Sequence, residues 1–311
     1  MATVSTIRTT EQRADSTHVG RLPDFFIIGA MKAGTTTLYE YLCRHPDIFG
    51  CANKEPGFFS REQVFARGID WYRKLFEEAK PHQRCFEAST CYSRWPHFGD
   101  VAQRIAQAVP HACFIYIMRH PVDRAYSHYG HLMRLKVTMT FEQALEIYPE
   151  IIDASLYLQQ IQQFLEYFDR GRFLFLTLDD MQRTPDAVLE QVQMFLGLAV
   201  RDLTSGGPLR ANRAGTSTAT VRISDQLRRV RHWPGVAQIA TAVPASWRAN
   251  LHRRLTQTLS NSVVGRTLAD RHKSRFSPML PETRRKLMER FAGPTRELER
   301  FLGRSLAEWM H

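Results

Sequence analysis

The sequence contains no apolar run that could cross a bilayer. Hydrophobic residues make up 43% of the chain, but no stretch of them approaches the roughly 20 residues that a membrane-spanning helix needs. Residues 1–22 are polar and lack the apolar core of a secretory signal. We therefore expect a cytoplasmic protein with a flexible tail at residues 1–22 and a single domain over residues 23–311.

Cysteine is also scarce, and motifs for zinc or nucleic-acid binding are missing. The five cysteines are an odd number and include no C-x-x-C pair, which argues against a disulfide framework and a zinc ribbon. We expect them to be reduced thiols. The sequence has no zinc-finger spacing, RNP-type aromatic motif or basic-region heptad, so we expect no nucleic-acid partner.

The positive charge of the chain is concentrated in its last third. Residues 1–200 hold 21 Lys and Arg against 23 Asp and Glu, whereas residues 201–311 hold 21 against 8. A basic segment of this kind suits an anionic ligand or peripheral contact with an anionic membrane face, and a solvated basic surface is the alternative. The oligomeric state is left open.

Short apolar runs alternate with stretches of helical pattern. The runs are typical of buried parallel strands and occur at Phe25–Gly29, Cys85–Ala88, Cys113–Met118 and Phe173–Leu178. Helical patterns occur at Thr36–Cys43, Val101–Ala108, Phe141–Ile147, Leu156–Phe168 and from Pro281 to Phe301. This order predicts a P-loop-like α/β fold of three layers, with a central parallel sheet flanked by helices. Residues 222–270 are Arg-rich and helical in pattern, and we interpret them as a C-terminal helical insertion.

The first strand leads into a loop that is typical of phosphate binding. Residues 25–38 read FFIIGAMKAGTTTL, in which Gly29 and Gly34 have the spacing of a Walker loop. The lysine, however, lies inside the loop. Backbone N–H groups between Gly29 and Thr36 would form a concave nest, and the dipole of the following helix favours an anion there. We expect the phosphate contacts to come from Lys32, Ala33, Gly34, Thr35, Thr36 and Thr37.

A magnesium–nucleotide site would need an acidic residue at the end of a neighbouring strand. The strand Cys113–Met118 ends instead in Arg119, which suits a second phosphate group. We therefore expect a phosphorylated ligand that binds without a metal. Two alternatives stay open: a small-molecule kinase that uses ATP, and a non-catalytic basic binding module.

The segment that follows this strand carries a second motif. Residues 119–129 read RHPVDRAYSHY, and Arg119 and Ser127 could converge on one phosphate. Together with the first loop, the segment resembles the two cofactor motifs of sulfotransferases that use 3′-phosphoadenosine 5′-phosphosulfate. GAMKAGTTTL resembles their 5′-phosphosulfate loop, and R-x-P-x-x-R-x-x-S resembles their 3′-phosphate motif. The resemblance implies this nucleotide as cofactor, adenosine 3′,5′-bisphosphate as product, and no metal.

Two further segments are similar to the carbohydrate branch of that family, which includes the heparan sulfate enzymes. They read KEPGFF at residues 54–59 and GIDWY at residues 68–72. By this resemblance, Glu55 is the general base that accepts the proton of an acceptor hydroxyl, and Lys32 stabilises the leaving phosphate. If Glu55 is not the base, the next candidates are His45, Glu87 and His128.

One segment departs from the glycosaminoglycan enzymes. They commonly show E-K-T-P-x-Y, whereas residues 87–92 here read EASTCY, so that Ala88 replaces a lysine that meets an acidic sugar. This disfavours a heparan-like acceptor. We expect Glu87, Ser89 and Tyr92 to line the acceptor cleft of a soluble bacterial enzyme, with a glycan, a glycolipid or a hydroxylated natural product as acceptor.

In relatives, a late loop completes the grip on the 3′-phosphate. Residues 212–217, which lead to Arg222, are the best-placed candidate in this chain, and a flexible linker is the alternative. We expect Arg222 to bind the cofactor.

Overall fold

The structure is a computed structural model that describes residues 20–134, 139–205, 207 and 278–310. Arg222, the predicted insertion at residues 222–270 and most of the predicted N-terminal tail lie outside these residues. The single-domain organisation therefore stays a prediction.

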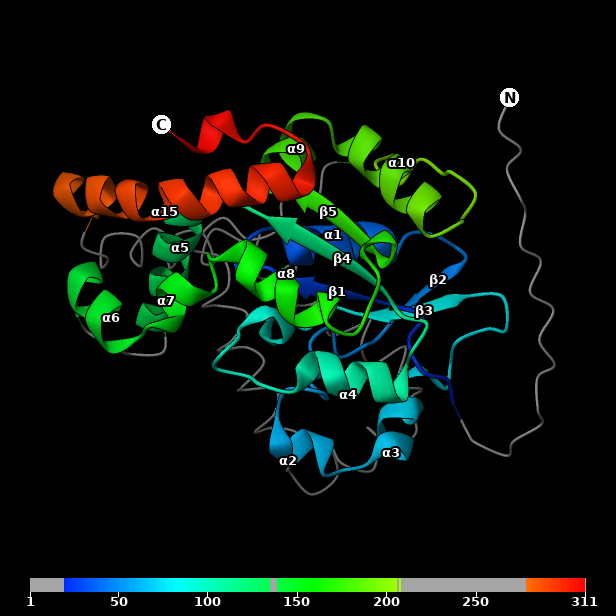
Figure 1. Cartoon of the computed structure of the whole chain (residues 1–311). Coiled ribbons are helices and arrows are strands. Elements are labelled where there is room, and N and C mark those ends of the chain that lie inside the picture. Colours follow the sequence, from blue (N-terminus) through cyan, green and yellow to red (C-terminus); the bar gives the residue numbers. More distant parts are fainter. Residues whose placement is uncertain (1–19, 135–138, 206, 208–277, 311) are drawn as a thin grey trace, which may run out of the picture.

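The centre of the described chain is a five-stranded sheet in which every strand pairing is parallel (Figure 1). The strands are β1 (Phe25–Gly29), β2 (Ile48–Gly50), β3 (Arg84–Glu87), β4 (Cys113–Met118) and β5 (Phe173–Thr177). Their order across the sheet is β2-β3-β1-β4-β5. Because parallel strands end at the same edge, the residues that follow β3, β1 and β4 are neighbours, with β1 in the middle.

Helices flank this sheet, which confirms the predicted α/β fold. In the first half of the chain they are α1 (Thr35–Leu42), α2 (Glu62–Phe65), α3 (Ile69–Arg73), α4 (Val101–Ala108) and α5 (Pro121–Arg134). The others are α6 (Phe141–Ile147), α7 (Glu150–Asp153), α8 (Tyr157–Leu165), α9 (Leu178–Arg183), α10 (Pro185–Phe195) and α15 (Pro281–Leu302). None of these described helices is both long and apolar enough to cross a membrane.

The two faces of the sheet are packed separately because side chains alternate along each strand. On β1, Phe26 and Ile28 point into one apolar cluster, which they share with α4 and α8. Phe25 and Ile27 point into the other, which they share with α1 and α10. Burial of each such side chain contributes about 1.5–3 kcal/mol. This strand is apolar throughout because both of its faces are covered.

The long C-terminal helix lies against α5 and α8 (Figure 1). Leu287 and Phe291 of α15 join a third apolar cluster, which contains residues of α5, α6 and α7. The helix ends where Gly303 adopts a left-handed backbone (φ 69°), a conformation that glycine accepts without strain. The last residues of the chain are thereby turned toward α9.

Candidate active site

The loop between β1 and α1 is shaped as an anion cradle. Lys32 and Gly34 both have a left-handed backbone, with φ of 71° and 96°. Within the described residues, no backbone carbonyl accepts from the N–H groups of Gly34, Thr35, Thr36 or Thr37. These groups lie at the positive end of the dipole of α1. Such a set of donors is what a phosphate or sulfate group requires.

Neighbouring strands hold this loop in place. The Ala30 N–H donates to the Ile117 carbonyl at 2.7 Å, which ties the loop to β4. At Gly34, a Cβ atom would lie 2.8 Å from Cδ1 of Leu178, the first residue of α9. The backbone angle therefore favours glycine at this position, and Leu178 of α9 would have to shift to admit a side chain.

Lys32 belongs to a group of cations around His128. Burial, helped by the charges of Arg124, Arg94 and Lys32, lowers the pKa of His128 to about 2. Nδ1 of this neutral ring accepts a hydrogen bond from Nη1 of Arg124 at 3.5 Å. His128 is therefore unsuited to act as a base, and the surrounding cations favour an anionic ligand.

Arg119 follows the end of β4 and is half-buried. The Tyr157 hydroxyl holds its backbone: it donates to the Arg119 carbonyl at 2.5 Å and accepts from the Arg119 N–H at 3.4 Å. In the part of the chain that the structure describes, no carboxylate forms an ion pair with the Arg119 guanidinium. A cation with a fixed backbone at a strand end is suited to a second phosphate group.

The second arginine of the same motif serves the fold instead. Arg124 is fully buried; its Nε donates to Ser155 Oγ at 2.5 Å, and its guanidinium also donates to the Ile151 carbonyl. These bonds tie α5 to α7 and the turn after it. Ser127 is half-buried on α5, and its contact with a 3′-phosphate stays a prediction.

Glu55 lies in the loop between β2 and α2, and both of its carboxylate oxygens are engaged. Lys54 Nζ donates to Oε1 at 2.6 Å, and Thr90 Oγ1 donates to Oε2 at 3.1 Å. The Ala88 N–H donates to the Lys54 carbonyl at 2.9 Å, so the loop is also tied to the end of β3. The Glu55 side chain is nevertheless 39% exposed. It is fixed in orientation and accessible from solvent, as a base that meets an acceptor needs to be.

Glu87, Ser89 and Tyr92 form a buried network below this loop. The Glu87 carboxylate accepts hydrogen bonds from Tyr92 (2.5 Å), Tyr72 (2.7 Å) and Ser89. Ser89 and Tyr92 in turn accept from the backbone N–H groups of residues 57 and 59, which belong to the Glu55 loop. Burial raises the pKa of Glu87 to about 7. All three predicted acceptor residues are therefore covered in this structure, and a direct contact with an acceptor stays a prediction.

The structure adds three residues to the predicted site and gives His45 a structural role. Thr90 orients Glu55, Tyr72 supports Glu87, and Tyr157 holds Arg119. Tyr72 lies in the GIDWY segment and Thr90 in the EASTCY segment, but the sequence alone predicts no role for these two residues. His45 is buried with its two ring nitrogens engaged, by Ala199 carbonyl and by a backbone N–H.

Comparisons with known proteins agree with this geometry. The family model of the sulfotransferase domain matches residues 22–257. The bifunctional heparan sulfate N-deacetylase/N-sulfotransferase 3 of Mus musculus is 31% identical over 201 residues, which are 58% of this chain and 23% of that protein. The heparan sulfate glucosamine 3-O-sulfotransferase 6 of Homo sapiens is 30% identical over 187 residues, which are 57% of this chain and 53% of that protein. The chain thus spans about a quarter to about half the length of these relatives.

A solved structure is similar over nearly the whole chain. The crystal structure of a sulfotransferase from Alicyclobacillus acidocaldarius superposes with a TM-score of 0.64 and 25% sequence identity. The match covers 94% of this chain and all of that one. The parallel sheet and its helices are therefore shared with a bacterial protein.

Proposed function

The chain belongs to the sulfotransferase domain family, and we propose that it transfers a sulfuryl group from 3′-phosphoadenosine 5′-phosphosulfate to a hydroxyl of a glycan, glycolipid or natural product. The observation that carries the proposal is the cradle at the start of α1, whose N–H groups at residues 34–37 find no backbone acceptor in the described chain. The cations Lys32 and Arg119 accompany it at the same edge of the sheet.

These residues fit the nucleotide in two places. The N–H groups and hydroxyls of Thr35, Thr36 and Thr37 would hold its 5′-phosphosulfate, together with Lys32 and the backbone of residues 33 and 34. Arg119 and Ser127 would hold its 3′-phosphate. When bound, the nucleotide supplies the sulfuryl group and a phosphate as leaving group. Arg222 is a further candidate for the 3′-phosphate, and the absence of a metal requirement stays a prediction.

Glu55 and Lys32 have different roles in the proposed reaction. Glu55 is held by Lys54 and Thr90 and accepts the proton of the acceptor hydroxyl while that oxygen attacks sulfur. Lys32 places its charge at the phosphate oxygen from which sulfur departs, where negative charge grows in the transition state. Base and cation thus act on opposite ends of one in-line displacement.

The acceptor is proposed only as a class. Two relatives carry heparan sulfate in their names, but Ala88 supplies no charge where such enzymes commonly have a lysine, and it is fully buried here. We therefore propose a hydroxylated acceptor that need not be acidic. A cytoplasmic location and a bacterial source stay predictions from the sequence.

A binding and transfer experiment tests the function. The full chain should bind adenosine 3′,5′-bisphosphate more tightly than Mg-ATP, and it should move labelled sulfate to a member of a panel of glycan, lipid and phenolic acceptors. Preference for Mg-ATP would support the kinase alternative. Absence of binding to both nucleotides would support a non-catalytic module.

A further inference from the structure

Residues 303–309, which follow α15, are here called the C-terminal segment. Glu299 shapes the turn into it: its carbonyl accepts from the Gly303 N–H at 2.9 Å, and its Oε1 accepts from the Leu306 N–H at 2.5 Å. Leu306 and Trp309 are both buried, with exposed fractions of 0% and 2%. The segment is therefore packed into the protein and has a defined position.

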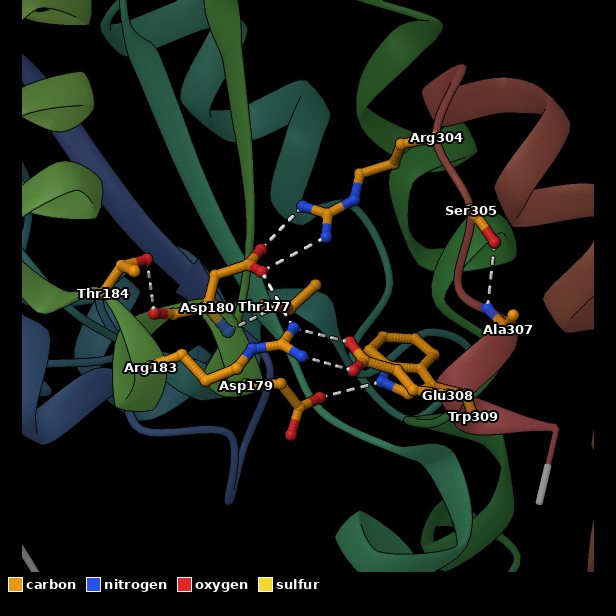
Figure 2. A network of polar contacts seen from close by, with 10 residues as sticks. All are labelled: Thr177, Asp179, Asp180, Arg183, Thr184, Arg304, Ser305, Ala307, Glu308 and Trp309. Atoms are coloured by element: carbon orange, nitrogen blue, oxygen red, sulfur yellow. Dashed lines mark hydrogen bonds and ion pairs between the residues drawn. The ribbon is translucent and has the colours of Figure 1, made fainter.

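The C-terminal segment is fastened to α9 by three side-chain contacts, which Figure 2 shows together. They are Arg304 to Asp180 at 2.6 and 3.3 Å, Arg183 to Glu308 at 2.8 and 3.0 Å, and Trp309 Nε1 to Asp179 Oδ2 at 2.9 Å. Solvent-exposed ion pairs of this kind contribute little to stability. Their common effect is to fix where the Trp309 ring lies.

The Trp309 ring packs on the residue that holds Arg119. Its centroid is 5.9 Å from that of Tyr157, whose hydroxyl bonds both the N–H and the carbonyl of Arg119. Burial raises the pKa of Tyr157 to about 12, so this hydroxyl keeps its proton and donates. One aromatic ring thus separates the C-terminal segment from the backbone of the proposed 3′-phosphate residue.

Helix α9, to which the C-terminal segment is bonded, also contacts the loop between β1 and α1. Leu178, which begins α9, lies where a Cβ of Gly34 would meet it at 2.8 Å. Asp179 and Asp180 follow immediately, and their carboxylates would repel an anionic ligand if they were left unpaired. Trp309 and Arg304 engage these two carboxylates.

We propose that the C-terminal segment positions the 3′-phosphate subsite, with Trp309 acting through Tyr157 on Arg119. The inference rests on the proposed function, because it takes Arg119 as a ligand of the nucleotide. Trp309 and Tyr157 are positioning residues: they hold the Arg119 backbone, and Arg119 meets the phosphate. Removing the ring should therefore weaken recognition of the 3′-phosphate and leave the contacts of the 5′-phosphate with α1 in place.

The test is calorimetry of the full chain with adenosine 3′,5′-bisphosphate and with adenosine 5′-monophosphate. We expect Trp309→Ala to lower the ratio of the two affinities about tenfold. Trp309→Phe keeps a ring against Tyr157 and should stay within about threefold of the wild-type ratio. Glu289→Gln, which loses only an exposed pair with Arg285 on α15, is the control and should leave the ratio unchanged.

Tyr157→Phe keeps the ring and removes the hydroxyl, so it tests the same path if Trp309→Ala fails to fold. We expect the ratio to fall in Tyr157→Phe, and no further in the double variant. If the wild type discriminates between the nucleotides but both single variants keep its full ratio, the positioning role is overturned while the proposed function stands. If the wild type does not discriminate, Arg119 is not a 3′-phosphate ligand and both proposals fail.

Discussion

The two halves of the proposed site differ in hydrogen-bonding character: one presents mainly donors, and the other mainly acceptors. On the β1 and β4 side, donors predominate: backbone N–H groups at residues 34–37, Lys32, and an Arg119 without a carboxylate partner in the described chain. On the β3 side, acceptors predominate: Glu55, and below it Glu87 with hydroxyls aimed at its carboxylate. A donor-rich half suits an anionic cofactor, and an acceptor-rich half suits a hydroxyl that has to lose a proton.

Removing the proposed base should have the largest effect, and it tests whether the acceptor half carries out proton transfer. Glu55→Gln keeps the size of the side chain and an oxygen for Thr90, so the loop should hold its position. We expect single-turnover transfer to fall about 10³-fold, within the 10²–10⁴ range of general-base removal, with unchanged binding of adenosine 3′,5′-bisphosphate. Glu62→Gln, on the exposed side chain of α2, is the control and should transfer normally. Near-full transfer by Glu55→Gln would remove Glu55 from the mechanism.

Lys32→Ala probes the donor half at the reacting centre. The charge that Lys32 meets grows in the transition state, so turnover should fall about 100-fold while the nucleotide affinity falls much less. Rapid-quench transfer and calorimetry measure the two quantities. Lys286→Ala removes an exposed lysine of α15 as the control. An equal fall in affinity and turnover would make Lys32 a ground-state binding residue only.

The donor half could be predicted from the sequence because its parts are local. Gly29, Gly34 and Arg119 lie within a few residues of strand ends, and buried strands such as Cys113–Met118 are visible as apolar runs. The strand Ile48–Gly50 was not predicted, since three residues give no pattern. The contact of Tyr157 with Arg119 joins residues 38 positions apart, and no local signal marks it.

The burial of the acceptor half could not be predicted from the sequence, because it depends on contacts between distant segments. Glu87, Ser89 and Tyr92 stand directly after a strand, where open clefts are common, and so they were expected to line one. In the structure they are covered, because Tyr72 and the Glu55 loop lie over them. In this structure they support the Glu55 loop, and their direct contact with an acceptor stays a prediction.

Arg119→Ala tests the other end of the donor half. Loss of one charge-assisted contact should weaken the binding of adenosine 3′,5′-bisphosphate by about 2–3 kcal/mol and leave the binding of adenosine 5′-monophosphate unchanged. Calorimetry with the two nucleotides measures this difference. Arg285→Ala, on the exposed face of α15, controls for the general loss of positive charge. A variant that still prefers the 3′-phosphorylated nucleotide as strongly as the wild type would refute the assignment.

Glu87→Gln should have the smallest effect on transfer. It tests whether Glu87 supports the structure of the site or takes part in the reaction. Glu87 reaches the Glu55 loop indirectly, through Ser89, Tyr92 and Tyr72, so we expect turnover to fall only about threefold. Stability should respond more clearly. Burial raises the pKa of Glu87 from 4.5 to about 7, so the folded state holds this proton more tightly than the unfolded state does.

The sign of the pH dependence follows from that shift. Below pH 4.5 both states are protonated at Glu87, and as the pH rises to about 7 the unfolded state loses its proton first, which favours unfolding. Over this window Glu87 costs the wild type about 3 kcal/mol, since each pKa unit corresponds to about 1.4 kcal/mol. Glutamine does not titrate. The stability of Glu87→Gln relative to the wild type should therefore improve by about that amount between pH 5 and pH 8, as measured by urea unfolding. Glu282→Gln, on an exposed turn of α15, should show no such gain. A relative stability of Glu87→Gln that does not change with pH would mean that Glu87 is ionised throughout this range, and the acceptor half would then hold a permanent negative charge beneath Glu55.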